Sequence, residues 1–263
     1  MILIGTSGWQ YKDWRGTFYP SDVPQSRWLE FYAGHFQTQE VNNAFYRLPS
    51  PETFRAWRDR TPDDFVMVVK ASRYLTHVKR LRDPEEPVRR LMANAGALGP
   101  KLGAVLVQLP PTLTYERFPE LEQTLACFPR SVRVAVEFRH DSWWRDETYD
   151  LLRRFDAACC LPDSPRRSAP LVRTAGWGYV RMHEGVASPR PCYGEKALDS
   201  WAQRVASLYP DGEDVFVFFN NDPHACAVRD ARLFALACRR HGLAHTRVPG
   251  PHDIHVLVTP TRT

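Results

Sequence analysis

Short apolar runs alternate with amphipathic segments along the whole chain. The clearest runs are residues 65–70 (FVMVVK), 103–109 (GAVLVQL) and 215–220 (VFVFFN). Runs of this length that are rich in branched and aromatic side chains are typical of buried strands. The eight predicted strands cover residues 2–5, 38–42, 65–70, 103–109, 132–138, 157–161, 177–182 and 215–220. The predicted helices cover residues 25–35, 85–98, 119–128, 146–155, 195–209 and 225–241, and another begins after Ser50 and Pro51.

Strands that alternate with helices pair in parallel, with helices covering the sheet. The strands recur about every 31 residues, which is close to the repeat of a (β/α)8 barrel. We therefore predict an α/β fold with one domain, a single closed (β/α)8 TIM barrel over residues 1–247. Residues 248–263 are expected to form a C-terminal extension of no assigned structure. Its His252 and His255 have the spacing of a metal motif, but a solvated tail is the better interpretation.

Polar residues gather where the predicted strands end. In the strand at 132–138, Ala135, Glu137 and Arg139 share one face, because side chains alternate along a strand. Catalytic groups in (β/α)8 barrels lie at these carboxyl ends, and buried charges often mark a site. The polar residues at or just beyond strand ends are Glu40, Asn42, Lys70, His77, Gln108, Glu137, Arg139, His140, Asp163, Arg181, His183, Asn220 and Asn221. The alternative is a structural layer in which Glu137 pairs with Arg139 or Arg181.

Four of these residues are candidate catalytic groups, namely Glu137, Lys70, His183 and Glu40. In one mechanism Glu137 acts as a general acid or base, provided that it reaches a pocket, while an anionic ligand is held by Lys70, Arg139 and Arg181. These cations should keep Glu137 ionised, which suits a base better than an acid. In a second, Lys70 forms a Schiff base, which requires a lowered pKa. In a third, divalent metal ions that cleave phosphodiesters are bound by Glu40, Glu137, Asp163 and the histidines.

The cations at the same strand ends compete with a metal ion for the carboxylates. No metal ligand and no cofactor are therefore assigned, although one weakly bound Mg²⁺ is compatible with the sequence. The expected ligand contacts come from Arg181, Arg139, His140, Gln108, Asn42, Asn220, Asn221 and His77. Aromatic residues near the strand ends, Trp9, Tyr11, Tyr46, Trp143 and Tyr193, suggest a stacked ring. The alternative is that these rings only pack the loops.

Charge agrees with an anionic ligand. The chain of 263 residues has a net charge of +5 and a pI of about 8.9. Only five of its 35 basic residues are lysine, and arginine binds carboxylates and phosphates with two hydrogen bonds, although a GC-rich genome would give the same bias.

Several ordered motifs resemble the YecE-like family of TIM-barrel proteins. They are Gly5-x-x-Gly8-Trp9-x-Tyr11, Phe18-Tyr19-Pro20, Glu40-x-Asn42 before Phe45-Tyr46, Lys70 with Thr76-His77, Gln108-Leu109-Pro110-Pro111, Glu137-Phe138-Arg139-His140, Arg181-x-His183 and Phe219-Asn220-Asn221. The resemblance runs from about residue 2 to residue 240. It implies a closed barrel with its pocket at these residues, but it implies no particular reaction. Glu184, between His183 and Gly185, departs from the family pattern.

The remaining features concern location and thiols. The start of the chain has no signal-peptide pattern, and no apolar run approaches the roughly twenty residues of a membrane span. A cytoplasmic protein without a membrane partner is therefore expected. Six cysteines without a C-x-x-C pair favour buried free thiols over a disulfide framework or zinc site.

These features favour an enzyme that binds a small anionic substrate, either a phosphorylated sugar or a nucleotide-like molecule, and uses acid-base chemistry. One alternative is a nucleic-acid-binding or phosphodiester-cleaving barrel that resembles metal-dependent abasic-site endonucleases. Another is a non-catalytic ligand-binding or interaction protein.

Overall fold

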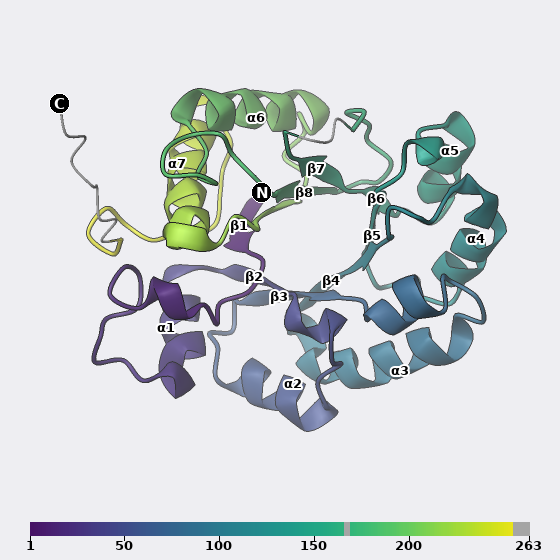
Figure 1. Cartoon of the computed structure of the whole chain (residues 1–263), viewed down its shortest axis with the longest axis horizontal. Coiled ribbons are helices and arrows are strands. Elements are labelled where there is room, and N and C mark those ends of the chain that lie inside the picture. The colour runs from purple at the N-terminus through teal and green to yellow at the C-terminus, as the bar shows by residue number, and fades with distance from the viewer. Residues whose placement is uncertain (166–168, 255–263) are drawn as a thin grey trace.

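The computed structural model describes residues 1–165 and 169–254 as an α/β protein. Its strands lie in the middle and its helices surround them (Figure 1). The strands are β1 (Ile2–Thr6), β2 (Thr38–Val41), β3 (Val66–Lys70), β4 (Leu102–Gln108), β5 (Val134–Glu137), β6 (Ala158–Cys159), β7 (Leu161–Asp163), β8 (Gly178–Met182) and β9 (Val215–Phe219). The helices are α1 (Trp28–His35), α2 (Pro51–Asp59), α3 (Glu85–Ala95), α4 (Phe118–Ala126), α5 (Asp146–Arg154), α6 (Glu195–Leu208) and α7 (Cys226–Arg240).

The order and type of the predicted elements are confirmed. The Ser50 side chain caps α2 by accepting a hydrogen bond from the Thr53 N–H at 3.3 Å, with Pro51 in the first turn. The predicted strand at 157–161 is instead two short strands, β6 and β7, which are interrupted at Cys160.

The prediction of a single closed (β/α)8 barrel is wrong. All strand pairs are parallel, but the strands form two sheets with the orders β1-β9-β8-β7 and β2-β3-β4-β5-β6. Within residues 1–165 and 169–254, no strand ladder joins the two sheets. Two local features explain the separation.

The first feature is a tyrosine hydroxyl between β1 and β2. The Tyr32 hydroxyl accepts a hydrogen bond from the Thr6 N–H at 3.0 Å and donates to the Thr38 carbonyl oxygen at 3.2 Å. The side chain thus satisfies one donor and one acceptor that a strand ladder would otherwise pair. The strands are nevertheless close, because a Cβ added to Gly5 would lie 2.3 Å from the Thr38 oxygen.

The second feature is the short edge at β6. The Thr174 hydroxyl accepts a hydrogen bond from the Cys159 N–H at 2.8 Å and donates to the Ala157 carbonyl oxygen at 2.7 Å. A side chain therefore satisfies the edge of β6 where the next strand would lie. The alternation of strands and helices in the sequence contains no signal that a side-chain hydroxyl would replace a strand partner at either place.

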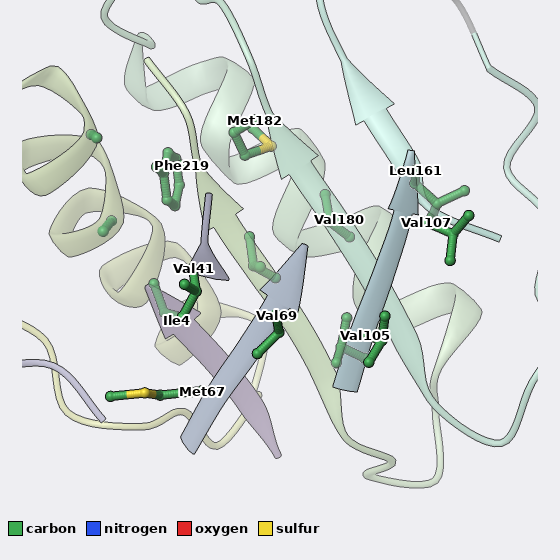
Figure 2. Packing of buried hydrophobic residues seen from close by; sticks show 14 of the residues in the cluster. Ile4, Val41, Met67, Val69, Val105, Val107, Leu161, Val180, Met182 and Phe219 are labelled. Carbon is green, nitrogen blue, oxygen red and sulfur yellow. The ribbon is translucent and has the colours of Figure 1, made fainter. Parts of the chain in front are cut away.

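The two sheets share an apolar interior between them and pack outward against the helices. Residues from both sheets, including Leu3, Leu106 and Phe218, form the inner cluster. The alternate strand positions point toward the helices and form the larger outer cluster (Figure 2). In that figure the outward side chains are Ile4, Val41, Met67, Val69, Val105, Val107, Leu161, Val180, Met182 and Phe219. In β2, β3, β4, β5 and β8 this alternation leaves the last inward position for a polar side chain.

The expectation of free thiols is wrong for two cysteines. Cys192 and Cys226 form a disulfide that ties the segment before α6 to the first residue of α7. The two lie 34 residues apart, so only the folded chain brings them together. Cys127, Cys159, Cys160 and Cys238 are free.

No helix formed by the described residues is long and apolar enough to cross a membrane. The predicted C-terminal extension begins at residue 248, and its residues 255–263, including His255, lie outside the described part.

Replacing Tyr32 by Phe should lower the free energy of unfolding by about 1–3 kcal/mol, because the buried Thr6 N–H and Thr38 oxygen lose their partner. Urea unfolding followed by tryptophan fluorescence measures the change. Tyr46→Phe is the control, since Tyr46 is 75% exposed, and it should change stability by less than about 0.5 kcal/mol. Equal stabilities for the two variants would contradict the role of the Tyr32 hydroxyl.

Candidate functional site

Arg181 joins the two sheets at their carboxyl ends. It lies on β8, is 1% exposed, and donates from Nη1 to Glu137 Oε2 and from Nη2 to Glu40 Oε1, both at 2.7 Å. Glu137 belongs to β5 and Glu40 to β2, so one guanidinium binds two carboxylates of the opposite sheet. The Tyr179 hydroxyl donates to Glu40 Oε2 at 2.5 Å. These four side chains form a buried polar layer above the apolar interior.

Two further groups contact Glu137 from above. Arg139 donates from Nε to Glu137 Oε1 at 2.7 Å, and His183 Nε2 lies 3.3 Å from the same oxygen. Burial alone would raise the pKa of Glu137, but Arg181 together with His183 and Arg139 lowers that pKa well below its usual range. Glu137 is therefore ionised, as the sequence predicted from the nearby cations. Gln108 Oε1 accepts from Arg139 at 3.2 Å.

The burial of this layer changes the roles assigned from the sequence. Glu137 and Glu40 are fully buried, and neither lines a described cavity. Direct contact of these carboxylates, or of Arg181, with a ligand does not agree with that position. The ion pairs that the structural alternative requires, from Glu137 to Arg139 and to Arg181, are present. Glu137 in turn contacts Arg139 and His183, which are less buried.

Lys70 ends β3 beside this layer. Its Nζ donates to Asn42 Oδ1 at 3.1 Å and lies 4.3 Å from the centre of the Phe45 ring. Burial, together with Arg181, lowers the pKa of Lys70 to about 8. This direction is the one that either proton transfer or Schiff-base formation requires.

Two histidines complete the upper part of the site. The Asn220 side-chain nitrogen lies 3.1 Å from His183 Nδ1. If the Asn220 amide donates this hydrogen bond, His183 Nδ1 is the acceptor and the ring proton lies on Nε2, which faces Glu137. Burial lowers the pKa of His183, which favours the neutral ring. His77 contacts Thr76 Oγ1 through Nδ1 at 2.8 Å, and burial and Lys70 lower its pKa as well.

Three of the predicted aromatic residues line a cavity of about 300 Å³ next to Asn42. These are Trp9, Tyr11 and Tyr46. The Tyr11 hydroxyl donates to the Ser7 carbonyl oxygen at 2.6 Å. Tyr46 is the most exposed of the three. A ring-binding role is therefore compatible with these positions, and the cavity adjoins the partner of Lys70.

Other predicted ligand contacts support the fold instead. Trp143 is buried, stacks on Phe138 and donates from its indole nitrogen to the Leu113 carbonyl oxygen at 2.7 Å. His140 Nδ1 accepts a hydrogen bond from the Ser142 N–H at 3.1 Å and caps the turn that follows β5. A ligand-binding role for Trp143 does not agree with this burial.

Tyr193 and Asn221 hold the loop between β8 and α6. The Tyr193 hydroxyl accepts from the Glu184 N–H at 3.1 Å, so the glutamate that departs from the family pattern is fixed by this tyrosine. Asn221 donates to Asp230 at 2.7 Å, and the same carboxylate accepts from the Tyr193 N–H. Both side chains are buried and position the loop, so the predicted ligand contacts do not agree with their places.

Sequence reasoning missed three residues of the site. Tyr179 shares a strand face with Arg181, so the alternation within β8 contained the signal. Phe45, beneath Lys70, belongs to a quoted motif but was given no role. Asp222 directly follows Asn221, and burial raises its pKa to about 7. The pKa shift of Asp222 depends on tertiary contacts with no signal in the sequence.

The donor set does not suit a multinuclear metal centre. Across the residues whose positions the structure gives, no three His, Cys, Asp or Glu side chains are grouped as metal ligands. Glu40 and Glu137 are already bound by Arg181, and Arg139 also binds Glu137. A divalent ion would have to displace these guanidinium groups.

Comparison with known proteins gives consistent similarities. A family described as "Protein of unknown function DUF72" matches residues 3–252. The UPF0759 protein YecE of Escherichia coli K12 is 32% identical over 144 residues, which are 55% of this chain and half the length of YecE. The UPF0759 protein YunF of Bacillus subtilis 168 is 26% identical over 260 residues, covering 84% of this chain and 89% of YunF.

Solved structures show the same fold. A DUF72 family protein from Thermotoga maritima has a TM-score of 0.78 and 29% identity, and the match covers 91% of this chain and 99% of that one. A DUF72 family protein from Enterococcus faecalis has a TM-score of 0.77 and 20% identity over 91% of this chain and 96% of that one. The arrangement of elements is therefore shared across distant sequences.

Arg181→Met should lower the free energy of unfolding at pH 7 by about 3–5 kcal/mol, because two buried carboxylates lose their cation. The pKa values of those carboxylates should then rise in the folded protein, so that it binds more protons than the unfolded chain. The difference in unfolding free energy between wild type and Arg181→Met should consequently become smaller as the pH falls from 7 to 5 in urea titrations. Arg204→Met, on the exposed face of α6, is the control. A stability difference that does not change with pH would contradict the ion pairing of Arg181 with the two buried carboxylates.

Lys70→Met should raise stability at pH 7 by up to about 3 kcal/mol, the cost of holding a charged lysine at a pKa of about 8 instead of 10.5. The wild-type folded state binds fewer protons than the unfolded chain between these pKa values, so its stability should rise with pH there. The difference between variant and wild type should therefore shrink from pH 8 to pH 10. Urea unfolding at several pH values measures this difference in unfolding free energy. A difference that stays constant with pH would contradict the lowered pKa of Lys70.

Proposed function

This chain belongs to the DUF72 family, as its YecE-like motifs predicted, and we propose that it binds a small anionic ligand above Lys70 and Arg139. One observation carries the proposal. The Lys70 ammonium is only 6% exposed, yet no carboxylate of the described residues lies within ion-pair distance of it. A buried cation without an anionic partner is costly unless a ligand supplies the charge.

The charge balance of the cluster supports an anion. Glu40 and Glu137 are matched by Arg181 and Arg139, so Lys70 remains as the excess positive charge. The lowered pKa values of His77 and His183 favour neutral rings that donate or accept hydrogen bonds without adding charge. A phosphate or carboxylate of the ligand would complete the balance.

Lys70 is also the group best suited to chemistry on such a ligand. With a pKa of about 8 it exchanges a proton near neutral pH, which makes it a general acid or base. We therefore move the acid-base role from Glu137 to Lys70. A phosphorylated sugar combines an anion with carbonyl or hydroxyl groups that such a lysine would act on. If the ligand carries a carbonyl, borohydride trapping at Lys70 would distinguish a Schiff base from proton transfer.

Arg139 and the neighbouring amides are placed to orient the ligand. Arg139 is 18% exposed while its Nε is held by Glu137, so the buried carboxylate fixes the guanidinium at the surface of the site. Asn42 and Asn220 are half-buried at the same strand ends. The buried layer thus acts on the ligand only through the groups above it.

Lys70→Met should weaken binding of phosphorylated sugars or inorganic phosphate by about tenfold or more, since a charge-assisted hydrogen bond is lost. Isothermal titration calorimetry on the full chain measures the affinity. For the wild type the affinity should fall as the pH rises through about 8, where Lys70 loses its proton. Lys70→Met should lack this dependence.

Lys196→Met is the matched control, because Lys196 is an exposed lysine on α6. Equal affinity in Lys70→Met and Lys196→Met would refute the proposed site. Binding that depends on Lys70 without turnover of any bound compound would favour a non-catalytic ligand-binding protein.

A further inference from the structure

A second and larger cavity lies beside the cluster around Lys70. It has a volume of about 710 Å³, within the range of ligand pockets, and lies between the segment that follows β2, the turn η4 (Tyr74–Val78) and helix α3. We call it the arginine groove. The residues that give it its character are Tyr46, Arg47, Arg73, Tyr74, Glu86 and Arg90.

The groove has an excess of positive charge. Arg47, Arg73 and Arg90 are all exposed and line it, with Glu86 as the only lining carboxylate among the described residues. In the part of the chain that the structure describes, none of these three guanidinium groups forms an ion pair or a hydrogen bond. Most of the other arginines in the described part of the chain form ion pairs with acidic side chains. Three unpaired guanidinium groups around one cavity are suited to several phosphates at once.

The same groove exposes two aromatic rings. Tyr46 is 75% exposed and Tyr74 is 49% exposed, whereas most aromatic side chains of this protein are buried. Exposed rings beside arginines are the combination with which proteins bind unpaired bases along a charged backbone. Two exposed rings and three unpaired guanidinium groups around one cavity offer more contacts than a single phosphate group needs.

We propose that the arginine groove binds single-stranded nucleic acid, with phosphates on Arg47, Arg73 and Arg90 and bases stacked on Tyr46 and Tyr74. The inference goes beyond the anion site at Lys70 and uses none of its charged residues. The two sites meet at Asn43 and Tyr46, which line both the groove and the smaller cavity.

The test is fluorescence anisotropy of a labelled twelve-residue oligodeoxythymidine with the full chain, at several salt concentrations. Wild type should bind with a steep salt dependence. Arg47→Gln combined with Arg90→Gln should reduce the slope of log affinity against log salt by about 1.4, because two phosphate contacts are lost. Arg204→Gln is the control, since Arg204 is exposed on α6 and does not line the groove, and it should leave the slope unchanged.

Stacking is tested on the tyrosines. Tyr46→Ala combined with Tyr74→Ala should weaken binding by about fivefold or more for each base that no longer stacks. Replacing both tyrosines by Phe, which keeps the rings, should retain wild-type affinity. Unchanged affinity in the double alanine variant would reduce the groove to a general polyanion surface and overturn the assignment.

The remaining outcomes separate this inference from the function proposed for Lys70. If oligonucleotide binding is lost in the groove variants and retained in Lys70→Met, the result supports nucleic-acid binding in the groove. This conclusion does not depend on whether phosphorylated sugars bind at Lys70. Binding lost in Lys70→Met and retained in the groove variants would place the strand at the central cluster and overturn it. Absence of wild-type binding would overturn it as well.

Discussion

The Arg181 guanidinium is the interaction on which the rest of the structure depends. The chain builds two sheets instead of one continuous sheet, so something other than a strand ladder must hold their carboxyl ends together. Arg181 does so by placing two nitrogens against carboxylates of the opposite sheet, Glu40 and Glu137. A planar guanidinium presents its donors in a fixed geometry, whereas the three donors of a lysine ammonium rotate at the end of a flexible chain. At the other edge the Tyr32 hydroxyl bridges β1 and β2 with neutral hydrogen bonds.

This arrangement decides which residues are available for chemistry. Because Arg181 holds both buried carboxylates and Arg139 also binds Glu137, neither acid is free to serve a substrate or a metal ion. The same pairing leaves Lys70 with a neutral partner, Asn42, and with a pKa near 8. A residue kept charged and buried at a cost to stability is typical of functional sites. The ion pairing of the two acids and the lack of an acidic partner for Lys70 therefore have one cause.

The strands, the helices and the polar strand ends could be predicted because their signals are local. Alternation along 132–138 correctly put Glu137 and Arg139 on one face, and the apolar runs correctly gave parallel strands. The absence of barrel closure could not be predicted. It depends on Tyr32 and Thr174, two ordinary helix and loop residues whose hydroxyls take the place of strand partners. Burial could not be predicted either. Nothing in the spacing of Trp143 or Arg181 distinguishes a side chain that meets a ligand from one sealed beneath it.

The segment after β2 links the two proposed sites through adjacent residues. Asn42 binds Lys70, Phe45 lies beneath the same ammonium, and Tyr46 lines both cavities. Arg47 then faces the arginine groove. These residues lie in or directly beside one short turn, η3 (Asn43–Phe45), so a single stretch of chain supplies both the neighbours of Lys70 and part of the groove wall.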